Sequence, residues 1–71
     1  LYPNPSKGKI FVNSSIIYND ISIYNIVGKE VYLNKEESQE IIDISNLNNG
    51  IYFINFNTKE GVITKKIILD K

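Results

Sequence analysis

Short apolar runs separated by turn-forming residues extend along the whole chain, and this pattern restricts the fold more than any other feature. The runs that we expect to form strands are 9–12, 21–26, 30–34, 39–44, 51–56 and 62–69, with 16–18 returning toward the core. Runs this short do not suit helices of ordinary length, and no alternation of strands with helices indicates a parallel α/β sheet. Their spacing of about 8–12 residues is typical of sandwiches. We therefore expect an all-β fold, a small Ig-like antiparallel β-sandwich of about six or seven strands.

The length of the chain, 71 residues, suffices for one small core, so we expect residues 1–71 to form a single domain. Met is absent, so Leu1 is not a natural start and we expect a segment of a longer polypeptide. The run 51–56 is apolar on both faces, which is typical of a central strand buried on both sides. In the run 30–34, Val31 and Leu33 are expected to point inward. The expected core residues are Ile23, Val31, Leu47, Ile51, Phe53, Ile63 and Ile67.

Two connections are expected to be tight turns. Gly28, between Val27 and Lys29, is expected to have a positive φ angle. Residues 57–61 are expected to form a hairpin loop that ends in a glycine bulge. The glycines occur singly along the chain, so none of them marks a phosphate-binding loop.

The composition excludes most catalytic chemistry. Cys and His are absent, which removes a thiol nucleophile, a disulfide framework, thiolate zinc sites and the commonest general base. Glu36, Glu37 and Glu40 lie close together, but in a charged segment that we expect to be solvated. The formal net charge is zero, which favours neither nucleic acid nor an anionic membrane as a partner. We expect no enzyme activity and no cofactor.

The segment from Asp43 to Gly50 is rich in oxygen donors, which raises the question of a calcium site. An EF-hand loop that placed Gly50 at its sixth position would put Leu47 at the third and Phe56 at the twelfth, where ligands are required. The match fails. Asp43 and the Asn side chains are expected to bond the backbone of their own loop, and calcium binding stays open as the less favoured alternative.

Four segments together resemble a known family. They are Tyr2-Pro3-Asn4-Pro5 with Gly8 following, the strand–turn–strand of residues 23–31, the D-x-S-x-L-x-x-G-I-Y stretch of residues 43–52, and the Lys-bearing end of residues 65–71. In this order and spacing they are similar to the C-terminal sorting domain (type A) of the bacterial type IX (Por) secretion system. Two positions depart from the family pattern, because Asn25 stands where Asp is usual and Val27 where Leu is frequent.

The resemblance implies a sorting signal at the C-terminal end of a secreted cargo protein in the Bacteroidetes. The implied partners are the outer-membrane type IX translocon with its shuttle proteins, a cell-surface sortase and an upstream cargo domain in cis, without nucleic acid or stable membrane insertion. The implied route leads through the periplasm to the outer-membrane surface or the extracellular space, with cleavage upstream of Tyr2. The expected recognition residues are Pro3, Asn4, Pro5, Gly28, Lys29, Gly50, Tyr52, Lys65, Lys66 and Lys71.

These residues also have a purely structural interpretation, in which Gly50 serves backbone geometry and Tyr52 packs in the core. The terminal hairpin, residues 50–71, is the preferred recognition element. The main alternative function is a noncatalytic accessory module of a secreted enzyme, fibronectin-like or carbohydrate-binding. In that case Tyr18, Tyr24 and Tyr32 are the expected sugar contacts.

Overall fold

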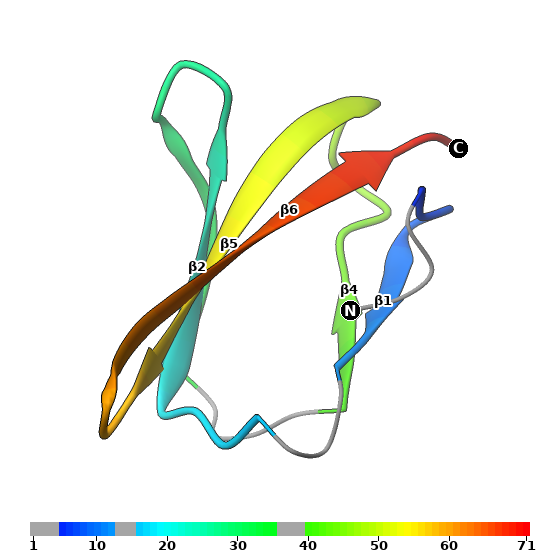
Figure 1. Cartoon of the computed structure of the whole chain (residues 1–71). Coiled ribbons are helices and arrows are strands. Elements are labelled where there is room, and N and C mark those ends of the chain that lie inside the picture. The colour runs from blue at the N-terminus through cyan, green and yellow to red at the C-terminus, as the bar shows by residue number, and fades with distance from the viewer. Residues whose placement is uncertain (1–4, 13–15, 36–39) are drawn as a thin grey trace.

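The computed structural model describes residues 5–12, 16–35 and 40–71, and these form six strands and no helix. The strands are β1 (Lys9–Phe11), β2 (Asp20–Asn25), β3 (Glu30–Asn34), β4 (Ile41–Asp43), β5 (Gly50–Thr58) and β6 (Gly61–Leu69). They make two antiparallel sheets that face each other (Figure 1). The expected all-β sandwich is confirmed. In the described part of the chain no helix could cross a membrane.

The larger sheet has the strand order β3-β2-β5-β6, and the smaller one pairs β1 with β4. β5 lies inside the larger sheet between β2 and β6, so the expectation that this run is a central strand is confirmed. A parallel bridge places Ser6 beside Leu69 on the outer edge of β6. The Ser6 N–H donates to the Ile68 carbonyl at 2.7 Å, and the Asp70 N–H donates to the Ser6 carbonyl at 2.8 Å. The two ends of the described chain are therefore tied together.

The core lies between the two sheets and follows the period-two alternation of each strand. β2 and β5 contribute the directly paired residues Ile21–Phe56 and Ile23–Ile54. The Tyr18 ring packs on that of Phe56, with ring centroids 5.3 Å apart. Full burial of one such side chain stabilises the fold by about 1.5–3 kcal/mol. Among the described residues, the buried apolar ones are Ile10, Val12, Tyr18, Ile21, Ile23, Ile42, Ile44, Tyr52, Ile54, Phe56, Ile67 and Leu69.

The expected core was right in part. Ile23 and Ile67 are buried, and Val31 and Leu47 are half-buried against the core. Ile51, Phe53 and Ile63 were wrongly placed there, since they are 39%, 37% and 37% exposed.

The two sheets explain these errors. The small sheet covers only one face of β5, the face of Tyr52, Ile54 and Phe56, so β5 is not buried on both sides (Figure 1). Ile63 does share a face with its partner Phe56 but remains exposed at the hairpin end. Leu33, also expected inward, pairs with Ser22 on the uncovered face and is 49% exposed.

Both expected turns are present, but the glycine bulge expected at the end of the second is not, because the β5–β6 register runs without a shift to the Thr58–Gly61 pair. Gly28 has a φ of 84°, as predicted, and its N–H donates to the Asn25 carbonyl at 3.0 Å. The β5–β6 connection is tighter than expected, because Thr58 pairs directly with Gly61 and only residues 59–60 form the turn. The Thr58 hydroxyl donates to the Gly61 carbonyl at 2.7 Å and accepts from the Glu60 N–H, which closes the turn.

Candidate functional site

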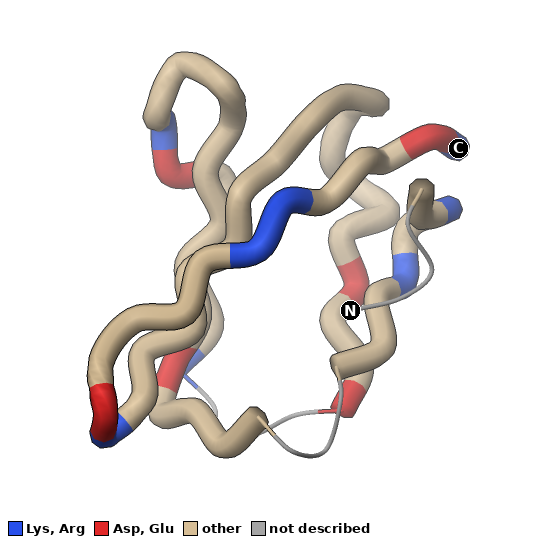
Figure 2. Tube along the Cα trace, in the orientation of Figure 1, with Lys and Arg blue, Asp and Glu red and all other residues tan. Residues whose placement is uncertain are grey.

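The terminal hairpin, β5–β6, holds most of the expected recognition residues. Its strands pair without interruption from Gly50–Leu69 to Thr58–Gly61. Lys65 pairs with the buried Ile54, whereas Lys66 pairs with Phe53 on the opposite face. The two lysines are adjacent on the chain (Figure 2), but the pleat directs them to opposite sides of the sheet. They cannot therefore contact one flat partner surface together.

The last residue, Lys71, is fastened to the loop that precedes β5. Its backbone N–H donates to the Asn49 side-chain oxygen at 2.9 Å, and its ammonium group donates to the Ser45 carbonyl at 3.1 Å. Together with the Ser6 bonds, these contacts hold the chain end against the body of the domain. The Lys71 charge thus has a structural role in addition to any contact with a partner.

The loop from Asp43 to Tyr52 stabilises itself through its own polar groups. The Asp43 carboxylate accepts a hydrogen bond from the Ser45 N–H at 2.9 Å, and the Tyr52 hydroxyl donates to the Asn48 carbonyl at 2.6 Å. Hydrogen bonding by the side chain and then the backbone of Ser45, aided by the charge of Lys9, lowers the pKa of the Asp43 carboxyl below 3.8. Tyr52 is buried. The expectation that Asp43 bonds its own loop is confirmed, and Tyr52 lies in the core.

The remaining expected residues are not part of the terminal hairpin, although Pro5 precedes Ser6 at the edge of β6. Gly28 and Lys29 are exposed in the β2–β3 turn, and Pro5 is exposed beside Ser6. Pro3 and Asn4 lie outside the described residues, as do Glu36 and Glu37 of the expected acidic cluster. The expected recognition residues therefore do not converge on one site.

Three polar side chains that hold these elements were missed by the sequence reasoning. The Asn25 side-chain oxygen accepts from the N–H groups of Val27 at 3.1 Å and Lys29 at 2.9 Å, so one side chain organises the whole turn. Ser6 is fully buried, donates to the Lys9 carbonyl at 3.0 Å and accepts from the Gly8 N–H at 3.0 Å. The Asn49 side-chain oxygen accepts from the Lys71 N–H, a contact outside the loop to which the Asn side chains were expected to bond. The only feature of the sequence that could have indicated these contacts is that Asn and Ser stand near the glycines of turns.

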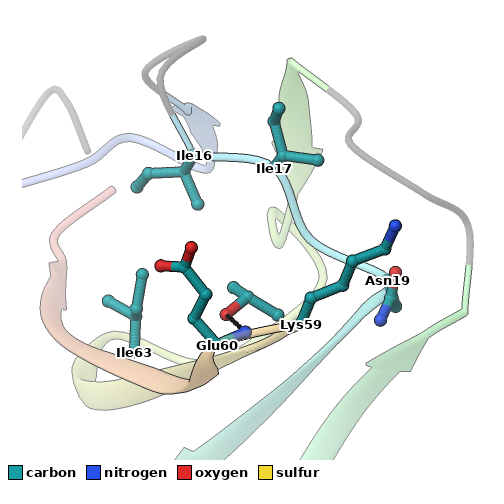
Figure 3. Close-up of a pocket in the computed structure, with 7 residues that line it drawn as sticks. Ile16, Ile17, Asn19, Lys59, Glu60 and Ile63 are labelled. Atoms are coloured by element: carbon teal, nitrogen blue, oxygen red, sulfur yellow. Dashed lines mark hydrogen bonds between the residues drawn. The ribbon is translucent and has the colours of Figure 1, made fainter.

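One hollow on the described surface does not have the groups of an active site. It measures about 580 Å³ and lies between the β5–β6 turn and the segment before β2 (Figure 3). Ile16, Ile17 and Ile63 form its apolar wall, and the Thr58 hydroxyl is already bonded within the turn. The remaining polar groups, those of Asn19, Lys59 and Glu60, supply no nucleophile paired with a base. In residues 5–12, 16–35 and 40–71, no three or more acidic side chains are placed so that they could hold a metal ion.

The expected sugar-binding tyrosines do not share a face. Tyr18 is 2% exposed and packs in the core, and Tyr32 is half-buried against it. Only Tyr24 lies on the uncovered face of the larger sheet, opposite Phe53. The three rings therefore do not form one flat aromatic surface for a sugar, because they lie on different sides of the larger sheet.

Comparison with known proteins gives one finding. The family model described as secretion system C-terminal sorting domain matches residues 1–70. Among curated proteins none matches the chain. The match supports the sorting signal and gives no support to the accessory-module alternative. With this match over almost its whole length, the chain belongs to the family of secretion system C-terminal sorting domains, which are the C-terminal signals for type IX secretion.

Proposed function

We propose that the type IX machinery binds this sorting domain in its folded state, through the terminal hairpin β5–β6. A domain of this family is a signal for export across the outer membrane and is not itself a catalyst. The observation that carries the proposal is the burial of Ile67 and Leu69, each 1% exposed, in the last strand. Because β6 is part of the core, its sequence is not available as an extended peptide while the domain is folded.

Part of the outer β6 edge has no backbone partner among the described residues, which supports binding by addition of a strand. The Ile68 carbonyl and the Asp70 N–H point away from β5, toward Ser6. Backbone groups alternate in direction along a strand, so those of Val62 and Thr64 also point outward. No backbone hydrogen bond from the described residues reaches these two positions. An unpaired edge of this kind can pair with an extended segment of a partner.

A substitution at Thr64 tests this mode of binding. Thr64→Pro removes the outward N–H, and proline is tolerated at sheet edges. The matched control is Thr64→Val, which keeps the backbone N–H and removes the hydroxyl that bonds Asn55. Each variant is fused to a periplasmic reporter and expressed in a bacterium with the type IX system. We expect surface delivery with wild type and Thr64→Val and retention with Thr64→Pro. Both variants must show the circular dichroism of the folded domain, and efficient delivery of Thr64→Pro would refute strand addition.

The fate of the domain after export is a second part of the proposal. A cell-surface sortase cuts upstream of Tyr2, and the cargo is released to the medium or attached at the outer-membrane surface. The compact fold supports this, because Ser6 lies beside Leu69 and is hydrogen-bonded to Ile68 and Asp70, so the domain can leave as one unit. Mass spectrometry of the delivered reporter is expected to show loss of all residues from Tyr2 onward. A delivered reporter that still carries these residues would contradict the cut.

A further inference from the structure

A chemically reactive dipeptide, Asn49-Gly50, stands where the loop after β4 enters β5. In an Asn-Gly step the backbone nitrogen of the glycine can attack the side-chain amide carbon of the asparagine, because glycine has no side chain that obstructs the approach. Every other asparagine of the chain is followed by a residue that carries a side chain. Asn49 is therefore the asparagine of this sequence that is most open to the reaction.

The folded domain holds the Asn49 side chain and the backbone just before it. Asn49 is exposed to solvent, but its side-chain oxygen accepts a hydrogen bond from the Lys71 N–H at 2.9 Å. The preceding carbonyl, that of Asn48, accepts from the Tyr52 hydroxyl at 2.6 Å. The amide that would react is thus fastened to the end of the chain, and its backbone is fastened to a buried ring.

The attacking nitrogen, that of Gly50, is held in the β5–β6 ladder. Gly50 pairs with Leu69. The Ile68 carbonyl and the Asp70 N–H point away from β5, toward Ser6. Because backbone groups alternate in direction along a strand, those of Leu69 point toward β5, and the Gly50 N–H faces the Leu69 carbonyl. Both the nitrogen and the amide must leave their partners before they can react with each other.

We propose that Asn49-Gly50 is a self-modification site that folding closes and unfolding opens. In the unfolded chain the Gly50 nitrogen forms a bond to Asn49 Cγ, the bond from Cγ to the amide nitrogen breaks, and ammonia leaves with the proton of the Gly50 nitrogen. Water then opens the resulting five-membered imide at either carbonyl, which leaves aspartate or isoaspartate. The reaction consumes only water.

The products differ from the native loop in charge and in backbone length. Both place a carboxylate where Asn49 had a neutral amide, beside Lys71. Isoaspartate also adds one atom to the main chain directly before Gly50, which displaces Gly50 from its partner Leu69. The site therefore records the time that the domain spends unfolded before export, and the isoaspartate form folds less stably. This inference goes beyond the sorting function and does not depend on it.

The first test compares the 71-residue chain in buffer and in guanidinium chloride, at the same neutral pH, temperature and ionic strength. Peptide mass spectrometry follows the conversion of Asn49, with Asn48 and Asn25 as references in the same samples. We expect the Asn49 rate in the folded chain to be at most about one tenth of the rate in the unfolded chain. Equal rates in the two states would overturn protection by the fold. A rate in the unfolded chain no faster than that of Asn48 would overturn the site.

The second test opens the contact with Lys71. Lys71→Pro removes the N–H that bonds Asn49, whereas Lys71→Gln keeps it, and both variants lose the ammonium group. With both shown to be folded by circular dichroism, we expect Lys71→Pro to convert Asn49 about fivefold faster than Lys71→Gln. Equal rates would overturn the role of this hydrogen bond. Neither test contains an export step, so a negative result leaves the sorting function intact.

The third test measures what the modification does to the fold. The isoaspartate form is separated from the aged unfolded chain and returned to buffer, and it is expected to unfold at a lower guanidinium concentration than wild type. The matched variant is Asn49→Asp, which keeps an oxygen acceptor for the Lys71 N–H and the normal backbone, and which should unfold near wild type. An isoaspartate form with the wild-type midpoint would overturn the effect on the start of β5.

Discussion

At the scale of single residues, Gly8 is where the backbone of the N-terminal segment meets the loop after β4. The Gly8 carbonyl accepts from the Ile44 N–H at 2.7 Å, and a Cβ added at Gly8 would lie 2.8 Å from the Ser45 Cβ. Its φ is +133°, so Gly8→Ala meets both backbone strain and a clash. We expect a loss of about 2–5 kcal/mol in the free energy of unfolding, measured in urea.

The control for Gly8 is a second glycine with nearly the same backbone. Gly61 has a φ of +128°, but nothing lies within 4 Å of an added Cβ. Gly61→Ala should therefore lose only the backbone part, about 1–3 kcal/mol. Equal losses of unfolding free energy in the two variants would show that Ser45 moves away from the added Cβ without an energetic cost.

Asp43 gives a prediction about acid stability. Its pKa is lowered in the folded domain by hydrogen bonding from Ser45, so the carboxylate form favours folding. This contribution is complete above the unfolded pKa of 3.8 and is lost as the pH falls through the lower folded value. Asp43→Asn keeps an oxygen acceptor but does not titrate. We expect unfolding free energies from about pH 6 to about pH 2 to fall less steeply in the variant. Parallel curves would contradict a lowered pKa.

At the scale of elements, the β2–β3 turn depends on one side chain. The Asn25 oxygen accepts two backbone N–H groups, from Val27 and Lys29, that would otherwise be left to water. Asn25→Ala is expected to lower the free energy of unfolding by about 1–2 kcal/mol, because both bonds are lost at once. Asn25→Asp retains the acceptor and should be close to wild type. A urea series in which Ala and Asp behave alike would show that the turn does not depend on this oxygen.

The strands were predictable because turn residues separate them, whereas the buried faces were not. Glycine and asparagine at 28 and 48–50 set the ends of the strands within a few residues. β5 is apolar on both faces, so the alternation that normally identifies the core side was absent. Ile51 and Phe53 were assigned to the core for that reason. Which face of β5 is buried is decided by the side on which β1 and β4 pack. The sequence of β5 itself does not show that side.

The candidate site shows the same limit. Gly28 was assigned correctly because a positive φ in a short turn follows from local sequence. The contacts of Lys71 with Asn49 and Ser45 join residues far apart in the chain. Such contacts exist only once β6 lies beside β5, so no spacing rule predicts them. The sequence therefore predicted that the terminal hairpin forms, but it did not predict which groups its lysine side chains contact.

At the scale of the whole molecule, the last strand holds both core residues and the proposed recognition residues Lys65 and Lys66. Deletion of residues 65–71 removes Ile67 and Leu69 from the core and takes the partner of Ser6 away. Truncation of each core residue costs about 2–5 kcal/mol, and a domain of this size has only about 5–15 kcal/mol of stability. We expect the shortened chain to be unfolded in buffer, with loss of its β circular dichroism signal.

This expected unfolding changes how a deletion is interpreted. Loss of delivery in the shortened fusion would follow from loss of the folded domain, whether or not a partner touches Lys65 or Lys66. The matched variant is Lys71→Gln, which removes one exposed charge and its bond to Ser45 but keeps every core residue. It is expected to unfold within about 1 kcal/mol of wild type. If the shortened chain instead kept a cooperative urea transition near that of Lys71→Gln, the last strand would be dispensable for the fold, and delivery after deletion would then report directly on recognition.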